Sequence, residues 1–456
     1  MQFPMTKRLS ILFLAFFFCA VSAASAQPLK KRRLVKPGPK AKEELVKPEP
    51  KTREDILKTV DRPVPKEGLL ARLLSAITID TPNGPIIPFP VVDSSKDLGP
   101  SFGMMPVIAI KDKKTGELKS VIVPSASYNE NLRTTLTYRH YIFPDEKRYF
   151  ILRASRSERV ERELMSYYYT PNVFYSGCRL SLETKHWVTG KPSFYGFGIN
   201  SQRGDKANYA LHMTGGEIIL DVPLKKEVFI NVNSSYFVKR IGDGPVSNGQ
   251  LKEIFPAAYA AAADSDRFLT NRISLVYDNT DHPSLPKIGT YASASVLYSN
   301  KRLGSDFEYR TYAFQMKNYF NYRGKGRFVT AVHYLLQFQR GDTLPFYATP
   351  QLGESTGLRM AGDGRFTGRG KFVFNIEERI TLSKTPFLKF ISETEIAPFL
   401  DVGTVFDRVS DFRARDLKYG PGISARLVIR PQLVATVDFA YGSEGTNAII
   451  KIGYPF

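Results

Sequence analysis

Alternation of apolar and polar residues along the second half of the chain constrains its fold more than any other feature. In the stretch "ISARL", Ile423 and Leu427 alternate with Ser424 and Arg426, and residues 432–442 continue the same pattern. A period of two residues places successive side chains on opposite faces of a β-strand. The pattern therefore predicts an all-β protein, although a soluble sandwich and a membrane barrel would show the same alternation.

Strand length and loop length distinguish these two architectures. From residue 99 to 456 the alternating segments number about sixteen, with a single strand predicted over 147–170, and they are roughly 10 to 18 residues long. Spanning strands need about 9 to 11 residues, whereas soluble strands average about 5 to 6. The connections 189–206, 241–264 and 342–365 are long and all follow odd-numbered strands. Short turns at one end and long loops at the other are typical of a transmembrane antiparallel β-barrel of the outer membrane.

The chain ends on an aromatic residue. Ile450, Ile452, Tyr454 and Phe456 alternate with polar or small residues, which predicts a last strand over 446–456. An unpaired strand edge in lipid would leave backbone groups without hydrogen bonds, so we expect this strand to close the sheet. The terminal pattern also resembles the signal by which barrel-assembly machinery recognises outer-membrane proteins during biogenesis.

The N-terminal region predicts export. Residues 1–26 combine a basic start, an apolar run and small residues before a cleavage site, which is typical of a signal peptide. Residues 27–66 hold 13 Lys/Arg against 6 Asp/Glu and many prolines, a composition that cannot bury a core. We expect 27–66 to be a periplasmic linker that contacts anionic lipid, cell wall or periplasmic partners, 67–98 a pre-barrel segment, and 99–456 the barrel.

Charge and histidine content narrow the function. The net charge of +20 would suit nucleic acid, but an exported protein rarely meets it, so we expect outer-membrane lipid and proteins as partners instead. The sequence contains no nucleophile or zinc motif around its scattered histidines, which are His140, His186, His212, His282 and His333. We therefore expect neither an enzyme nor a bound cofactor or metal.

The segment "LRMAGDGRFTGRGKFVFNIEER" begins in the long loop after the eleventh predicted strand. Together with "FLDVG" further on, it resembles the BamA/TamA-type outer-membrane assembly barrels, the bacterial surface antigen superfamily, over about residues 99–456. The resemblance implies that the sixth extracellular loop folds into the lumen and that Arg359 pairs there with Glu377 and Asp401 of the barrel wall. By parity, both carboxylates fall on the lumenal face of their strands.

The same loop contains the remaining motif residues. Where the family has a glycine and an aromatic residue after the arginine, this chain has Met360 and Ala361. We expect the glycines of the loop to adopt positive φ and to allow close packing. The loop motif comprises Gly362, Gly364, Arg365, Phe366 and Gly368.

Three further stretches carry the resemblance. "YDNTDHPSLPKIGTY" resembles a periplasmic turn of the family, with Asp278, Asp281, Pro286 and Gly289 in place. "SFYGFGIN" resembles the third loop, and "YGPGISARL" the final hairpins. Residues 27–98 are too few and too rich in proline for the periplasmic POTRA domains of members that fold or secrete proteins, which indicates a truncated branch of the superfamily.

Two functions remain open from the sequence. The first is non-enzymatic insertion or translocation of proteins or lipids, through a weak seam between the first and last strands where Gly453 and Pro455 would loosen pairing. Client outer-membrane proteins would then be partners. The second is a passive channel or structural barrel whose lumen favours anions because basic residues line it: Arg369, Arg379, Arg426, Arg430 and Lys451.

Overall fold

The computed structural model describes residues 79–81, 84–112, 118–145, 147–322, 326–387, 390–429, 433–452 and 454–456. The predicted signal peptide (1–26), the linker (27–66) and part of the pre-barrel segment (67–98) lie outside these residues. Within the described ranges, no helix has the length and hydropathy needed to cross a bilayer.

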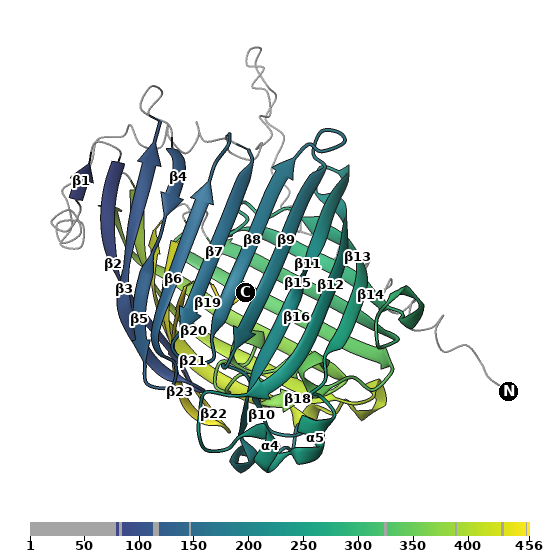
Figure 1. Cartoon of the computed structure of the whole chain (residues 1–456). Helices are drawn as coiled ribbons and strands as arrows, with labels where there is room; N and C mark the ends of the chain where they lie inside the picture. Colours follow the sequence, from purple (N-terminus) through teal and green to yellow (C-terminus); the bar gives the residue numbers. More distant parts are fainter. Residues whose placement is uncertain are drawn as a thin grey trace. The chain divides into compact units, whose positions relative to one another are not determined.

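Eighteen strands form a closed antiparallel barrel in which neighbours in the chain are neighbours in the sheet (Figure 1). β4 and β5 share one strand position, because both pair with β3 on one side and β6 on the other. The all-β antiparallel barrel is thus confirmed. Its strands are β2 (Gly84–Ser95), β3 (Gly99–Lys111), β4 (Leu118–Ile122) with β5 (Ser125–Asn129), β6 (Arg133–Ile142), β7 (Tyr149–Ser157), β8 (Arg162–Pro171), β9 (Arg179–Thr189), β11 (Ala207–Lys225), β12 (Val228–Asp243), β13 (Asp266–Asp278), β14 (Gly289–Ser299), β15 (Tyr309–Tyr322), β16 (Phe328–Gly341), β19 (Gly370–Phe387), β20 (Phe390–Phe406), β21 (Lys418–Ile429), β22 (Leu433–Gly442) and β23 (Gly445–Ile452).

Two strands were missing from the expected count of about sixteen, for different physical reasons. β2 has the sequence "GPIIPFPVVDSS", whose prolines argue against a strand because they lack the N–H that a ladder needs. The barrel accordingly begins at Gly84, inside the predicted pre-barrel segment, and not at 99. The single strand predicted over 147–170 is in fact β7 and β8, since the charged turn between them contains no glycine or proline to mark it.

Cross-strand register separates an outward face from a lumenal face. Tyr168, Leu182 and Ile218 are register partners on β8, β9 and β11, and their side chains belong to one face. Leu182 and Ile218 are 37% and 54% exposed, as suits side chains that meet lipid. The opposite parity holds the ionic and hydrogen-bonding groups of the lumen. We call these the outward and the lumenal face.

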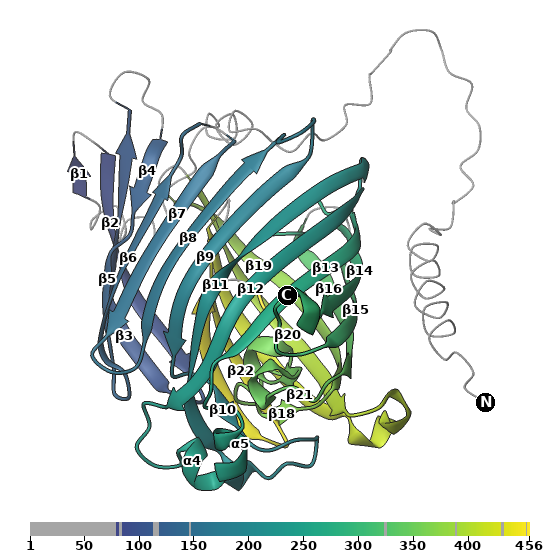
Figure 2. The same ribbon diagram turned by 45° about the vertical axis from the view of Figure 1, so that its right-hand side comes forward.

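The long connections gather at one end of the barrel. α4 (Leu251–Ile254) and α5 (Pro256–Ala260) lie there with the short strands β10 (Ser193–Phe194) and β18 (Phe366–Thr367), at the lower end in both views (Figures 1 and 2). Phe194 packs there against Phe255 and Phe346, with ring centroids 5.0 and 4.4 Å away, so three connections share one aromatic cluster. We call this the long-loop end, and it corresponds to the extracellular end of the predicted barrel.

β2 and β23 close the barrel through a short contact, which we call the seam. Ser94 and Ile450 form its only paired position among the described residues, whereas β22 and β23 share eight and β2 and β3 share ten. The seam is short because β23 ends at Ile452 while β2 continues toward the short-turn end. β1 (Ile79–Thr81) pairs with the beginning of β2.

Candidate functional site

The long connection after β16 folds into the lumen and is fixed there by Arg359. This side chain is 2% exposed. Its Nε and Nη2 donate to the two carboxylate oxygens of Asp401 at 2.8 and 2.7 Å, and its backbone N–H donates to the same carboxylate at 3.0 Å. Nη1 lies 3.4 Å from Oε2 of Glu377. The sequence-predicted trio is therefore brought together, with a bidentate ion pair at its centre.

Further charges complete this lumenal network. Glu377 also accepts from Arg379 at 2.7 Å and from Arg426 at 2.7 and 3.0 Å. Asp438 lies 3.8 Å from Arg359 and 2.9 Å from Lys451. Four cations thus face three carboxylates, all placed on β19 to β23 or on the loop.

Aromatic rings contact two of the arginines in this network, which has one more cation than it has carboxylates. The guanidinium of Arg359 lies 3.3 Å from the ring centroid of Phe399, and that of Arg379 lies 3.8 Å from that of Tyr454. Such contacts stabilise cations that have lost water. Arg379, Arg426 and Lys451 are paired with carboxylates, which weakens the expectation of a cation-lined pore that favours anions. Arg430 lies outside the described residues, and Arg369 donates to the carbonyl of Gly341 at the loop boundary.

Met360 and Ala361 explain how this loop packs without the family's glycine and aromatic residue. Both are fully buried. The Sδ of Met360 lies 1.9 Å from the point where a Cβ on Gly442 would stand, and its Cγ lies 3.0 Å from that point on Gly420. A flexible thioether therefore fills the hollows above two wall glycines.

The loop glycines mainly allow the loop backbone to lie close to neighbouring residues. Positive φ was expected for Gly362, Gly364, Gly368 and Gly370. Of these, only Gly364 adopts it, at +68°. A Cβ on Gly362 would lie 3.1 Å from Asp97 Oδ1, and one on Gly368 would lie 3.0 Å from Val405 Cβ. Their small size, and not a left-handed backbone, is what these two sites require.

A second buried arginine clamps the long-loop end of the seam. Arg365, stacked against Phe366, donates to Glu444 in the β22–β23 turn at 2.6 Å and to Ser201 Oγ at 2.8 Å. In the β2–β3 turn, Nζ of Lys96 donates to the carbonyl of Glu444 at 2.7 Å. The two sides of the seam are therefore tied together at this end.

Glu354 adds a carboxylate to this clamp. It accepts from Asn447 of β23 at 2.9 Å and from the backbone N–H of Lys96 in the β2–β3 turn. Burial, together with the nearby negative charges of Asp363 and Asp97, raises the pKa of Glu354 to about 7. A loop side chain thus bridges the first and last strands.

The predicted periplasmic turn motif lies between β13 and β14. Asp278 accepts from the backbone N–H and hydroxyl of Thr280 at 3.0 and 2.7 Å, and Asp281 accepts from the backbone N–H of Lys287 at 2.8 Å. The carbonyl of Pro286 accepts from Arg379 at 3.4 Å, which connects the turn to the lumenal network. Gly289 has φ +111°, and a Cβ there would lie 2.5 Å from the carbonyl oxygen of Asn279.

The C-terminal residues leave the wall. Ile450 stays on the outward face in β23, which ends at Ile452, so the last strand is shorter than the predicted 446–456. Tyr454 donates to Glu395 at 3.0 Å, and Phe456 stacks on His333 of β16 at 5.2 Å. Both views place the C-terminus within the outline of the barrel (Figures 1 and 2). The last aromatics therefore pack inside the lumen, because β23 no longer holds them in register.

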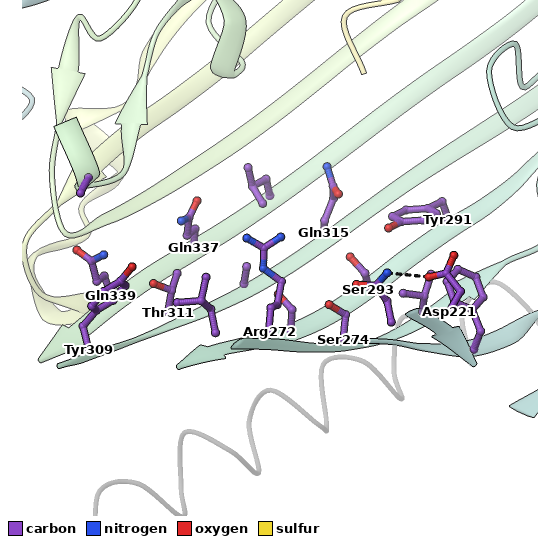
Figure 3. A pocket seen from close by; sticks show the side chains of 18 residues that line it. Asp221, Arg272, Ser274, Tyr291, Ser293, Tyr309, Thr311, Gln315, Gln337 and Gln339 are labelled. Atoms are coloured by element: carbon purple, nitrogen blue, oxygen red, sulfur yellow. Dashed lines mark hydrogen bonds between the residues drawn. The ribbon is translucent and has the colours of Figure 1, made fainter. Parts of the chain in front are cut away.

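The lumenal wall formed by β11 to β16 has a different character. It lines a cavity of about 560 Å³ with hydroxyl and amide groups such as Ser274, Gln315 and Gln337, all directed into one space (Figure 3). Asp221 in this wall accepts from Asn231 at 2.7 Å. The loop thus packs against the lumenal face of β19 to β23, whereas the lumenal face of β11 to β16 lines a polar cavity.

The arrangement holds the loop against the lumenal wall through ion pairs and hydrogen bonds. The described residues contain no group of three or more His, Cys, Asp or Glu side chains that could hold a metal ion. Cys178 is fully buried and free. What the site can do is hold a loop against one wall while the adjoining seam has little pairing.

Solved structures show where this fold occurs. BamA from Haemophilus ducreyi lacking POTRA domains 1–3 is similar over 76% of this chain and 75% of its own, with a TM-score of 0.52 and 13% identity. CdiB from Acinetobacter baumannii (TM-score 0.41, 11% identity, 80% of this chain and 59% of that chain) and CdiB from Escherichia coli (0.44, 9%, 80% and 62%) are also similar. A comparison with the curated proteins finds no significant match.

The family model described as the Omp85 superfamily domain matches residues 148–443, which is more than half of the chain. This match covers the wall from β7 to β22, the inserted loop and its arginine. The family and the BamA-like barrel indicate the bacterial outer membrane as the location. The chain is therefore a member of the Omp85 superfamily.

Proposed function

We propose that this barrel inserts outer-membrane proteins into lipid by offering a client strand the part of the β2 edge that lies between Ile86, where β1 pairs, and Ser94, where β23 pairs. The seam carries this proposal, because β2 and β23 share one paired position in the described chain. An edge with unpaired N–H and C=O groups is a template for another strand, and lipid gives those groups no alternative partner. General insertion or translocation is what Omp85 membership supports, and the client protein is our proposal.

The clamp at the long-loop end determines how the seam would open. Arg365, Glu444 and Lys96 hold that end closed, whereas the described part of β23 ends before it can pair with the lower part of β2. Opening would therefore begin between the end of β23 and the β1–β2 pairing, on the side of the short-turn end, where clients arrive from the periplasm. Gly453 lies outside the described residues, and Pro455 follows the end of β23. The linker 27–66 would bind clients or periplasmic partners, and the barrel-assembly machinery would insert this chain itself.

A cysteine lock tests the seam. Ser94→Cys/Ile450→Cys places two thiols at its paired position, and oxidation would fix the edge of β2. The control is Ser274→Cys/Ser295→Cys, a register pair between β13 and β14 away from the seam. We expect the oxidised seam lock to deplete client barrels from the outer membrane, reversibly on reduction, while the control lock has no effect. Equal outer-membrane protein content in both oxidised strains would reject the proposal.

A passive channel is the second candidate, and the open polar wall of β11 to β16 favours it (Figure 3). Depletion of the protein followed by outer-membrane proteomics separates the two. Loss of other barrels supports insertion, whereas altered solute uptake with normal protein content supports a channel.

A further inference from the structure

The outward face carries three arginines in one register row at its long-loop end. Arg156 of β7 lies directly opposite Arg162 of β8, whose partner on β9 is Val188. Val188 in turn lies opposite His212 of β11, which lies opposite Arg240 of β12. Register therefore places these residues in one continuous row across five strands.

The row faces the membrane. Leu164 follows Arg162 by two residues, so it has the same parity, and it is 62% exposed. Arg156, Arg162 and Arg240 are themselves exposed. The lumenal face of the same wall begins one residue away, at Glu163, which pairs with Arg153 at 3.0 Å.

A second, shorter row lies further round the barrel. Arg310 of β15 lies opposite Arg340 of β16. Their guanidinium groups lie 5.5 Å from the ring centroids of Tyr298 and Phe338, which share the outward face with them. Arg267 on β13 has a similar position but is neutralised by Asp306 at 2.7 Å.

Neither row is neutralised by the chain itself. No ion pair joins a carboxylate to Arg156, Arg162, Arg240, Arg310 or Arg340 within the described residues. Like charges directly opposite each other in an antiparallel sheet are destabilising, and here two Arg–Arg pairs occur. Anions supplied from outside the protein would remove this repulsion.

The arginines lie near the long-loop ends of their strands. At the opposite end of the same strands, the outward face carries Phe150, Tyr168, Leu180 and Ile230. An outward arginine costs far less at the interface than at the bilayer midplane, so the rows fit the head-group level of the outer leaflet. Near the long-loop end of the described strands next to the seam, the outward face carries uncharged residues, such as Phe372, Tyr419 and Tyr441.

We propose that the two arginine rows bind the phosphate groups of phosphorylated glycolipid in the outer leaflet. A guanidinium matches phosphate oxygens with two parallel hydrogen bonds, which a point charge cannot do. Residues directly opposite each other lie about 5 Å apart, so the two arginines of a pair can share one phosphate. Bound lipid would hold the wall from β7 to β16 and leave the seam, on β23 and β2, without such anchors.

Lipid counting by native mass spectrometry tests this. The full chain in detergent is titrated with a bis-phosphorylated glucosamine lipid and, separately, with its phosphate-free form. The test variants are Arg156→Gln/Arg162→Gln/Arg240→Gln and Arg310→Gln/Arg340→Gln, each first checked for a heat-modifiable barrel. The control is Arg408→Gln/Arg413→Gln/Arg415→Gln, which removes equal charge from the exposed connection between β20 and β21.

The wild-type protein should bind the phosphorylated lipid at least about tenfold more tightly than the phosphate-free form. The triple test variant should lose most of this preference, and the control should stay within about twofold of wild type. Arg→Lys changes at the same positions keep the charge and the fold. They should give intermediate binding because lysine cannot make the two parallel hydrogen bonds of a guanidinium to phosphate. Equal binding of the two lipids by wild type, or full preference retained when both rows are neutral, would overturn the proposal.

Discussion

Replacing Arg359 by methionine removes the central cation of the lumenal network and is the sharpest test of how the loop is held in the lumen. Asp401, fully buried, loses two side-chain hydrogen bonds and keeps donors from Asn375 at 2.8 Å and from the backbone of residue 359. Glu377 keeps Arg379 and Arg426. Breaking one partner of a buried pair costs about 3–5 kcal/mol, and the remaining donors place this change near the lower end.

The assay is the free energy of unfolding in detergent micelles, together with the temperature at which the folded band is lost in SDS. Arg369→Met in the same loop is the control, since the side chain of Arg369 makes a single hydrogen bond in the described structure, to the Gly341 carbonyl, and its loss should cost less than about 1 kcal/mol. The double variant Arg359→Met/Asp401→Asn removes the uncompensated charge and should recover at least half of the loss. An unchanged unfolding free energy in Arg359→Met, or a double variant no better than the single one, would refute the reasoning.

Three other changes probe separate contacts. Gly442→Ala directs a Cβ to within 1.9 Å of Met360 Sδ and should lower the heat-modification temperature, with only partial recovery when Met360→Ala is added, because the Cβ would still lie 2.6 Å from the carbonyl oxygen of Tyr419. Tyr454→Ala uncovers Arg379 and should destabilise the barrel by about 2–4 kcal/mol in micellar unfolding, whereas the same change at exposed Tyr441 should have little effect. The folded loop raises the pKa of Glu354 from 4.5 to about 7, so between these pH values Glu354 binds a proton in the folded loop but not in the unfolded one. Protease protection of the loop should therefore fall as pH rises through this window and become pH-independent in Glu354→Gln.

The barrel could be predicted because alternation is a property of each strand alone. The segment around Ile423 and Leu427 reads correctly without knowledge of its neighbours, and so does the parity of Glu377 and Asp401. β2 could not be found this way, since its prolines are tolerable only on a strand that pairs poorly on one side. That condition depends on where the sheet closes.

The contacts of the loop also divide into those that a local sequence pattern predicts and those that depend on how the sheet closes. Arg359 was indicated by a family motif, but Lys96, Glu354 and Glu444 carry no local signal and meet only because the seam brings the ends of the chain together. The departure of Tyr454 and Phe456 from the wall was missed because alternation continues past the residue where pairing stops. A periodic sequence shows which face a residue would take, and not whether a partner strand remains.

The inward course of the last residues has a practical consequence for handling the protein. Anything joined to the chain after Phe456 would start beside His333 within the lumen, so a purification tag or fluorescent fusion at that point would displace the aromatic packing or have to thread outward past it. Labels are better inserted in the connection between β20 and β21, whose side chains at Arg408 and Arg413 already face solvent.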